Sequence, residues 1–218
     1  MTKQHYILFL ICLLSSFKSI AQDAYTITYS NSLFYVFDSA GNPLITNPRN
    51  LLTKLIINDH QSYYYTYQVG NNYYNPKTPM GKKFLPHSDY TNKTEQKVIS
   101  QFGNEYRVVE KLIIPNWQLS EEKQSIAGFN CNKAILKTDK DSLIAWYTEK
   151  LPSIFGPYLY RGLPGTILET TLFRSDNIYR ITAILVEEKT NPIVIPKKGK
   201  LITWEEWQKM MQVRRSIR

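Results

Sequence analysis

The sequence predicts a mainly β protein, folded as a single twisted antiparallel sheet that forms a half-barrel or open barrel, with one C-terminal helix. Apolar and polar residues alternate over many short segments, which is the period of half-buried strands. Gly, Pro, Asn and Asp separate these segments at short intervals, which favours hairpins over parallel βαβ units. A sheet of so many strands usually curls or closes. The helix is predicted from a capping box near the C-terminus.

Residues 1–21 are expected to be a signal peptide. Lys3 and His5 give a positive start, residues 6–14 form an apolar core, and residues 19–21 place small side chains before a cleavage site. The apolar run is shorter than the ~20 residues that span a bilayer. We therefore expect export to the periplasm or the outer membrane, with no transmembrane segment in the mature chain. Residues 22–218 are expected to form a single β-rich domain.

Nine strands are expected from the alternation, punctuated by turn-forming residues. They are residues 25–29, 33–37, 51–57, 63–69, 106–114, 133–137, 143–147, 167–173 and 178–187. Residues 75–92 are rich in Pro and are expected to form a long loop. A second break at Pro115-Asn116-Trp117 precedes residues 119–131, which we expect to be an exposed crossing or hairpin.

A rigid loop is expected from Leu151 to Pro164, after the hairpin of residues 133–147. Pro164 favours extended geometry at Leu163, and Pro164-Gly165 fits the centre of a type II turn, where Gly165 needs a positive φ. The residues expected to fix the turns are Gly156, Pro157, Gly162, Pro164 and Gly165. The side chains expected to be exposed for ligand or partner contact are Tyr158, Tyr160, Arg161 and Leu163. Two roles stay open for this loop: Leu163 plugs an open end of the sheet, or the loop recognises a ligand.

The C-terminal helix is expected to begin at the capping box of Thr203 and Glu206. Trp204, Trp207 and Met211 then lie on one face at helical spacing, and basic residues follow. We expect this face to dock on the sheet and cover its apolar concave side. The alternative is a helix that lies on a membrane surface.

Charge and cysteine content exclude several classes of protein. The formal net charge is +9, and removing the two lysines before residue 22 leaves +7. The basic residues are spread along the chain without a nucleic-acid-binding motif, so we expect no nucleic-acid partner. Cys131 is the only cysteine after the signal peptide, which rules out an internal disulfide. Its apolar neighbours favour a buried structural thiol.

Tyrosine is unusually frequent, with sixteen residues, six of them between positions 63 and 74. In a strand, Tyr63, Tyr65 and Tyr67 would point to one face and Tyr64 to the other. Such a wall of rings can hold a sugar, a peptide or a lipid. The alternative is that tyrosine simply suits strands with one solvated face.

Motifs for metal binding and catalysis are missing from the sequence. His60 and His87 are the only histidines of the mature chain and lack ligand spacing, so no metal or cofactor is expected. No nucleophile elbow or zinc-protease helix occurs. We therefore expect no enzymatic activity. A hydrolase with a dispersed site around His87 and Asp89 is the least favoured alternative.

Five segments carry a resemblance to a known family. They are Trp117-Gln118-Leu119, residues 126–134 (IAGFNCNKA), Ala145-Trp146-Tyr147-Thr148, Gly156-Pro157 and residues 162–167 (GLPGTI). Over residues 117 to about 169 the chain resembles the GLPGLI family of exported Bacteroidetes proteins, with Thr166 in place of the leucine of the family name. The resemblance implies a signal peptide, a cell-envelope location, a β-rich fold and no established enzymatic activity. It supplies no catalytic residues.

The predicted function is non-enzymatic binding in the cell envelope, with an unknown physiological role. The expected ligand is apolar, lipidic or a peptide, held by the tyrosine wall or by the loop. The alternative is an accessory protein that docks on an outer-membrane or secretion complex through residues 156–165.

Overall fold

The computed structural model describes residues 24–37, 43–44, 51–58, 60–69, 72–73, 87–89, 92–101, 103–139, 141–151, 153–174, 177–188, 193 and 197–216. The expected signal peptide lies outside these residues. So does most of the expected long loop, apart from residues 87–89 and residue 92.

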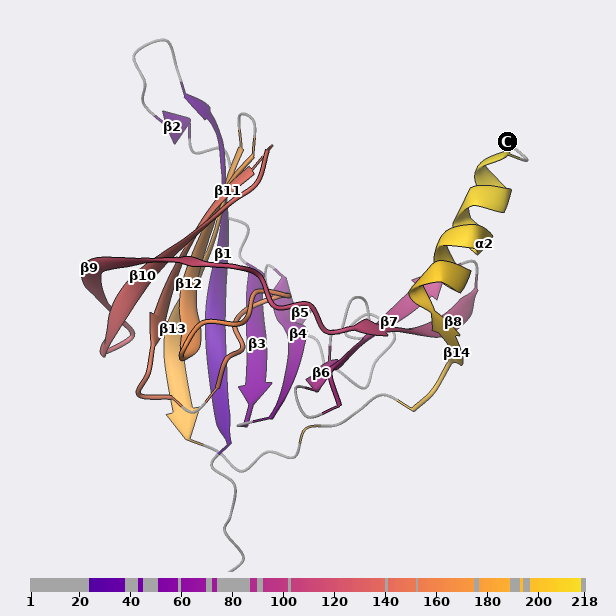
Figure 1. Cartoon of the computed structure of the whole chain (residues 1–218), viewed down its shortest axis with the longest axis horizontal. Helices are drawn as coiled ribbons and strands as arrows, with labels where there is room; N and C mark the ends of the chain where they lie inside the picture. Colours follow the sequence, from indigo (N-terminus) through magenta and orange to yellow (C-terminus); the bar gives the residue numbers. More distant parts are fainter. Residues whose placement is uncertain are drawn as a thin grey trace, which may run out of the picture.

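One sheet contains fourteen strands of the described chain, and one helix follows them (Figure 1). The first strands are β1 (Tyr25–Phe37), β2 (Pro43–Leu44), β3 (Leu51–Ile57), β4 (Gln61–Val69), β5 (Asn72–Tyr73), β6 (His87–Asp89), β7 (Thr94–Gln101) and β8 (Asn104–Lys111). The later elements are β9 (Gln118–Ile126), β10 (Phe129–Lys137), β11 (Asp141–Thr148), β12 (Thr166–Arg174), β13 (Asn177–Glu188), β14 (Lys200–Thr203) and α2 (Trp204–Ser216).

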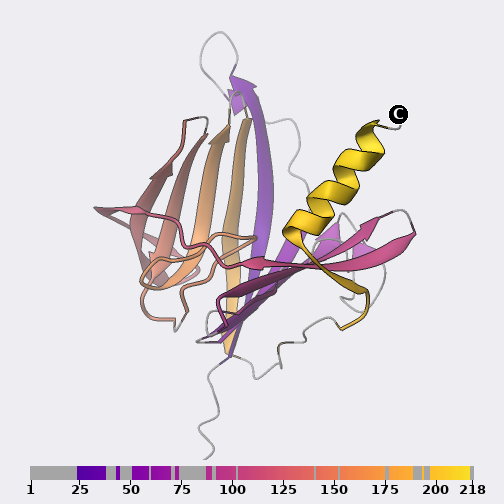
Figure 2. The same ribbon diagram turned by 45° about the vertical axis from the view of Figure 1, so that its right-hand side comes forward.

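The sheet is open, with β14 at one end and β9 at the other. The order across it is β14-β8-β7-β6-β4-β3-β1-β13-β12-β11-β10-β9, with β2 beside β1 and β5 beside β4. Described neighbours are antiparallel, except for β14, which runs parallel to β8. Figure 2 shows the strong twist between the long strands around β1 and the group formed by β6, β7, β8, β14 and α2, which we call the wing. The predicted open antiparallel sheet with a C-terminal helix is confirmed.

The first strand is longer than the sequence indicated. Two strands were predicted, at residues 25–29 and 33–37, but β1 continues through the polar residues between them. Both neighbours, β13 and β3, pair with this polar stretch. The side chain of Asn31 also donates hydrogen bonds to the carbonyl oxygen of Leu51 (3.2 Å) and to Oγ1 of Thr53 (3.0 Å). Pairing with β13 and β3 therefore keeps residues 30–32 in strand geometry although their sequence does not alternate.

Six strands lie outside the nine segments predicted as strands: β2, β5, β6, β7, β9 and β14. β7 carries charged residues at positions that pack inside the molecule, while β9 is an edge strand with a mostly exposed polar sequence. The expected exposed hairpin at residues 119–131 is confirmed as β9 and β10. The short β6 lies inside the stretch predicted to be a loop, and β14 is only four residues long.

The helix begins as predicted and docks on the sheet as expected, but at the end formed by β8 and β14. The backbone N–H of Thr203 donates to Glu206 Oε2 (2.7 Å), and the N–H of Glu206 donates to Thr203 Oγ1 (3.2 Å), so the capping box is confirmed. Trp207 packs against Tyr106, Val108 and Ile202 of the wing. The expectation that α2 covers the concave face was wrong, because β8 and β14 present their own apolar surface immediately before the helix begins.

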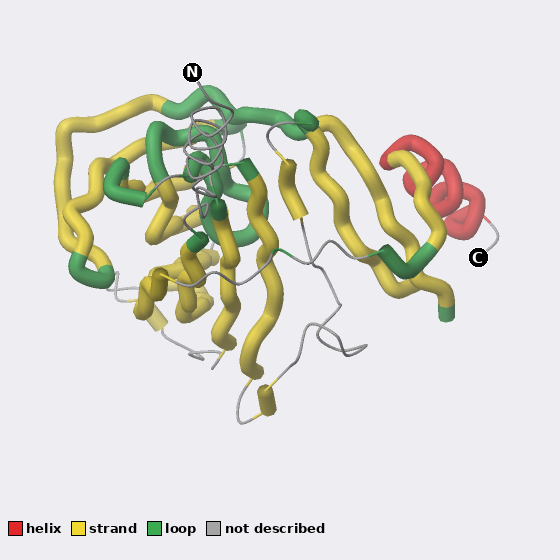
Figure 3. Tube along the Cα trace, turned by 90° about the horizontal axis from the view of Figure 1, so that it is seen from below, coloured by secondary structure: helices red, strands yellow, loops and turns green. Residues whose placement is uncertain are grey.

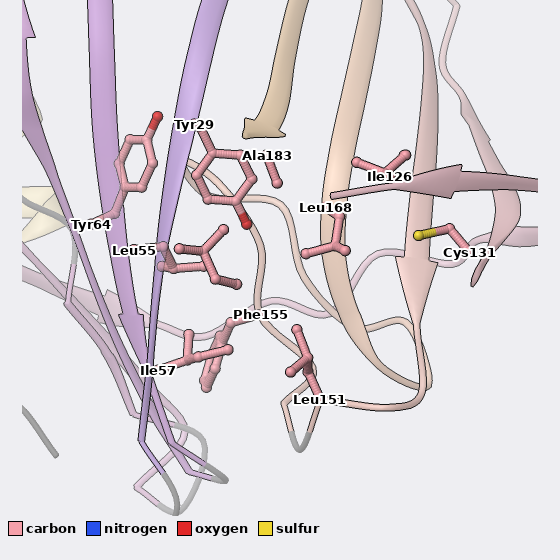
Figure 4. Close-up of a cluster of buried hydrophobic side chains, with 11 residues drawn as sticks. Tyr29, Leu55, Ile57, Tyr64, Ile126, Cys131, Leu151, Phe155, Leu168 and Ala183 are labelled. Atoms are coloured by element: carbon pink, nitrogen blue, oxygen red, sulfur yellow. The ribbon is translucent and has the colours of Figure 1, made fainter. Parts of the chain in front are cut away.

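The main core lies where the long strands meet the loop that follows β11. Its buried members are Ile27, Tyr29, Leu55, Ile57, Tyr64, Ile126, Cys131, Leu151, Phe155, Leu168 and Ala183 (Figure 4). Figure 3 shows loop segments gathered along the curved sheet. The chain between β11 and β12, rather than the helix, thus supplies the side chains that complete this core.

Candidate functional site

Two segments lie together on one face of the sheet, and they form the candidate site (Figures 1 and 2). The first is the connection between β11 and β12, residues 149–165, which we call the Gly-Pro loop; its residue 152 is not described. The second is the connection between β8 and β9, residues 112–117, which we call the strap. The indole N–H of Trp117 in the strap donates to the carbonyl oxygen of Arg161 in the loop (2.8 Å) and ties the two together.

Backbone hydrogen bonds fold the Gly-Pro loop back on itself. The N–H of Gly162 donates to the carbonyl oxygen of Ile154 (2.7 Å), and Phe155 forms a β-bridge with Arg161. The N–H of Ile167 donates to the carbonyl oxygen of Phe155 (3.0 Å) and fastens the loop to β12. The loop is therefore a fixed part of the fold, as the density of Gly and Pro predicted.

The glycines are required mainly for close approach. A Cβ on Gly165 would lie 2.2 Å from the carbonyl oxygen of Thr148, and one on Gly156 would lie 2.5 Å from Cβ of Ile167. Gly165 is not among the described residues with positive φ, so the predicted type II turn with left-handed Gly165 is wrong. Gly162 has that geometry instead, with φ of +90°, and a Cβ there would meet Cγ2 of Ile114 at 2.5 Å.

Leu163 is buried, with 1% of its surface exposed. It packs with Ala134, Ala145, Tyr147 and Ile167 in a second cluster, against which Trp117 and Tyr160 also rest. The expectation of an exposed Leu163 was wrong, because the loop folds inward and uses this side chain to fill the space over the sheet. Of the two roles left open, the plug agrees with this position.

Arg161 is also buried, contrary to the expected exposure, and its charge is compensated by a chain of ionic contacts. Its guanidinium pairs with Glu95 of β7, which is 3% exposed, and Glu95 pairs with Lys97 at 2.9 Å. Lys97 pairs in turn with Glu110 of β8, and its Nζ lies 5.5 Å from the ring centroid of Trp204. We call Arg161, Glu95, Lys97 and Glu110 the ionic chain.

The charge on Lys97 is favoured by its neighbours. Burial by itself lowers the pKa of this ammonium, but hydrogen bonds to Glu110 and Glu95 outweigh burial and raise the pKa above its ordinary value. Lys97 therefore stays charged at neutral pH. Sequence reasoning missed the ionic chain, because no strand was predicted at Glu95 and Lys97 and neither residue was singled out.

Tyr158 and Tyr160 stand at the tip of the loop. Their rings lie 6.2 Å apart in an edge-to-face arrangement. Tyr158 is 43% exposed and has a left-handed backbone with φ of +58°. Tyr160 is half-buried, and burial raises the pKa of its hydroxyl. Of the four side chains expected to be exposed, Tyr158 is the one that is exposed.

The tyrosines of β4 do not join the loop. Tyr63 and Tyr65 pack with Ile56 and Ile193 and are 4% and 9% exposed. Tyr64 points to the opposite face, as the alternation predicted, and belongs to the main core (Figure 4). The side chain of Tyr67 lies outside the described residues. The residues proposed for ligand contact are therefore divided between two faces of the sheet.

Tyr64 and Tyr29 point to the face of the sheet on which the Gly-Pro loop lies, and both belong to the main core. The hydroxyl of Tyr29 donates to the carbonyl oxygen of Ile167 (2.7 Å), and that of Tyr64 donates to Oγ1 of Thr53 (2.7 Å). Burial raises the pKa of both hydroxyls well above the ordinary tyrosine value. The strand alternation in the sequence predicted that the side chains of Tyr63 and Tyr64 point to opposite faces of the sheet.

Exposed apolar side chains occur on the strap, on the Gly-Pro loop and at the start of β9. Ile113 is 73% exposed and Ile114 is 45% exposed, although Leu112 beside them is buried. Leu119, at the start of β9, is 60% exposed and pairs with Ala134 of the cluster around Leu163. We call Ile113, Ile114, Leu119 and Tyr158 the apolar rim. The sequence predicted a strand through residue 114 and therefore did not single out these isoleucines.

The polar groups offer little catalytic chemistry in the part of the chain that the structure describes. His60 is exposed in a turn, where its backbone N–H donates to Asn58 Oδ1 (3.0 Å). His87 begins β6, and its side chain is not described. Asp89 accepts hydrogen bonds from the backbone and side chain of Asn92 (2.9 and 2.8 Å) and from Gln61 (3.0 Å). These bonds give Asp89 a turn-stabilising position.

No group of three or more His, Cys, Asp or Glu residues suited to a metal ion occurs among the described residues. Within the same residues, none of the helical structure has the length and apolarity to cross a membrane. Cys131 is buried, and desolvation raises the pKa of its thiol to about 11. A thiol with that pKa is a poor nucleophile at neutral pH.

A comparison with family models finds a match in this region. Residues 137–169 match a family model described as a protein of unknown function (Porph_ging). The match includes β11, the Gly-Pro loop and the start of β12. No curated protein shows significant similarity to the chain.

The fold is similar to part of a larger solved protein. The structure of PNGF-II in space group C2 has a TM-score of 0.63 at 16% identity, covering 87% of this chain and 33% of that chain. The same protein in space group P21 gives a TM-score of 0.59 at 16% identity, with the same coverage. The chain thus spans about a third of the length of PNGF-II.

A more distant match is the lipoprotein LppX from Mycobacterium tuberculosis. Its TM-score is 0.32 at 7% identity, covering 89% of this chain and 100% of that chain. A likeness at that score does not establish a common fold.

Proposed function

We propose that the protein is a non-enzymatic binding protein of the cell envelope, and that the apolar rim is where it holds an apolar, lipidic or peptide ligand. The observation that carries this proposal is the exposure of Ile113, Ile114, Leu119 and Tyr158 around a loop whose backbone is fixed. Clustered exposed apolar side chains often mark interaction sites. A fixed backbone loses little conformational entropy when a ligand binds.

The apolar rim is better placed to bind a ligand than the tyrosine wall of β4. Tyr63 and Tyr65 are already covered, so they have little ring surface to offer. Leu163 is likewise used inside the protein. In contrast, Ile114 packs directly on Gly162, and Leu119 adjoins the cluster that Leu163 fills. The rim is therefore supported from beneath by the Gly-Pro loop.

The alternative is that the rim docks on an envelope protein complex, with Tyr158 as its contact residue. Its left-handed backbone favours this alternative, because a non-glycine residue held at positive φ is uncommon and is often found at functional positions. Leu163→Asp is a poor test of either function, since the substitution would bury a carboxylate and unfold the loop.

Native mass spectrometry of the purified mature chain is the direct test. We expect a co-purifying lipid or peptide on the wild-type chain that is lost from Ile113→Asp and Leu119→Asp. Leu201→Asp is the matched control, because Leu201 is similarly exposed (57%) on β14, at the opposite end of the sheet from β9. Equal retention by all three variants would place the ligand elsewhere. Partner capture that depends on Tyr158 without a bound small molecule would support the alternative.

A further inference from the structure

The strap is an extended segment in which one backbone N–H, that of Leu112, has a described backbone partner. The N–H of Leu112 donates to the carbonyl oxygen of Lys93 (2.8 Å), which continues the β7–β8 ladder by one residue. Beyond this bond, the backbone of residues 113–116 has no hydrogen-bond partner among the residues that the structure describes. Figure 1 shows the strap as a continuous path from β8 to β9.

The free edge of the strap has a definite direction. Pro115 restricts Ile114 to extended geometry. In an extended chain, alternate N–H groups point to the same side, so those of Ile114 and Asn116 point to the edge on which Leu112 meets Lys93. Pro115 has no N–H, so the opposite edge lacks the donor between those of Ile113 and Trp117.

The side chains of the strap complement this edge. Ile113 and Ile114 are exposed on successive positions, which places one on each side of the segment. Lys111, two residues before Ile113, is exposed, and the chain from residue 22 carries a formal net charge of +7. A ligand with backbone donors and acceptors, apolar side chains and an acidic end would match all three features. A fatty acid matches the apolar side chains and the positive charge, but it has no backbone donors and acceptors to match the edge.

We infer that the strap binds an extended apolar peptide with an acidic end, which adds as a strand along the edge formed by Ile114 and Asn116. This inference rests on the proposed function and names its ligand class. Main-chain hydrogen bonds to an exposed strand edge are a common mode of peptide recognition, in which alternate side chains give specificity. In this mode the peptide extends the line of β7 past Lys93.

The test uses the full mature chain and the peptide acetyl-Glu-Glu-Val-Thr-Val-Thr-Val-amide. Two analogues of this peptide are compared with it. In one the backbone nitrogens of the valines are N-methylated, and in the other those of the threonines. Each analogue therefore loses the N–H donors along one edge of the extended peptide. We expect one analogue to bind at least about tenfold more weakly and the other to stay within about threefold of the parent. The amide NMR signals of Ile114 and Asn116 should shift on binding of the parent peptide.

Equal binding of the parent and both analogues would overturn the inference, since strand addition requires one edge. Ile113→Asp should weaken binding, while Leu201→Asp should not. Sodium dodecanoate is the lipid probe. If it binds and is lost from Ile113→Asp while the peptide does not bind, the proposed function stands and the peptide inference fails. If neither probe binds and no ligand co-purifies, both fail.

Discussion

Burial keeps the thiol of Cys131 protonated at neutral pH. The side chain is 1% exposed, and its Sγ lies 3.5 Å from the carbonyl oxygen of Phe129. Desolvation is the main reason that its pKa rises to about 11, and the nearby carboxylate of Glu169 adds to the rise. The predicted burial of this cysteine is confirmed.

Alkylation of Cys131 should therefore be slow in the folded protein. In a chain with Cys12→Ser, we expect iodoacetamide to react with native Cys131 on the order of a hundredfold more slowly than in urea, because the thiolate is rarer and covered.

The raised pKa of Cys131 also makes stability depend on pH, because an unfolded thiol ionises near pH 8.5. Stability from the raised pKa is thus complete below about pH 8.5 and is lost as the pH rises toward 11. Cys131→Ala should lose less stability than the parent over that range, as measured by urea unfolding. An equal loss would argue against the raised pKa.

At the scale of the element, the Gly-Pro loop depends on the absence of a side chain at Gly165. Its Cα faces the backbone of residues 148–149, and a Cβ would lie 2.2 Å from the carbonyl oxygen of Thr148. This contact is with backbone of the strand end, which cannot rotate away as a long side chain can. The loop would have to move, and it carries Leu163 and Arg161 in their buried positions.

Gly165→Ala should therefore lower the free energy of unfolding by more than the strain of placing a side chain at a positive φ would. We expect a loss of more than about 2 kcal/mol in the free energy of unfolding, measured in urea. The control is Gly103→Ala, where φ is +76° but no atom lies within 4 Å of the added Cβ. That substitution should cost only about 1–2 kcal/mol, the cost of left-handed geometry. A Gly165→Ala variant as stable as Gly103→Ala would show that the loop adapts.

The elements that the sequence predicted well are those decided by local chemistry. Alternation located most of the long strands, and the pair Thr203 and Glu206 located the helix start. The sequence could not show where these elements pack. Leu163 follows the same local rules whether it points out or in, and its burial depends on β10 and β11 beneath it. Likewise, Glu95 and Lys97 are recognisable as core residues only when Arg161, more than sixty residues later, is placed beside them.

At the scale of the whole molecule, the ionic chain connects two parts that otherwise have separate cores. Arg161 belongs to the loop over the long strands, while Glu95, Lys97 and Glu110 belong to the wing. The wing core contains Tyr106, Val108, Ile202 and Trp207, and Lys97 lies beside Trp204 at its border. Within the main sheet the wing is joined through the short strand β6. The ionic chain therefore connects the wing to the loop in addition to β6 and the strap.

Removing Arg161 should destabilise the protein strongly, because Glu95 would stay buried with only part of its compensation. We expect Arg161→Met to lower the free energy of unfolding by about 3–5 kcal/mol in urea. Arg174→Met is the matched control, since Arg174 also forms an ion pair, with Asp141 at 2.7 Å, but its side chain is 57% exposed. Exposed pairs contribute little, so this control should change stability far less.

The double variant separates the ion pair from the loss of the arginine alone. Glu95→Gln removes the buried charge, so Arg161→Met should cost less in that background than in the wild type. If the ionic chain links the wing to the loop, Arg161→Met should also speed amide hydrogen exchange in β7 and β8 as well as in the Gly-Pro loop. Faster exchange in the loop alone would mean that Arg161 holds only its own segment, and that β6 suffices to join the wing to the sheet.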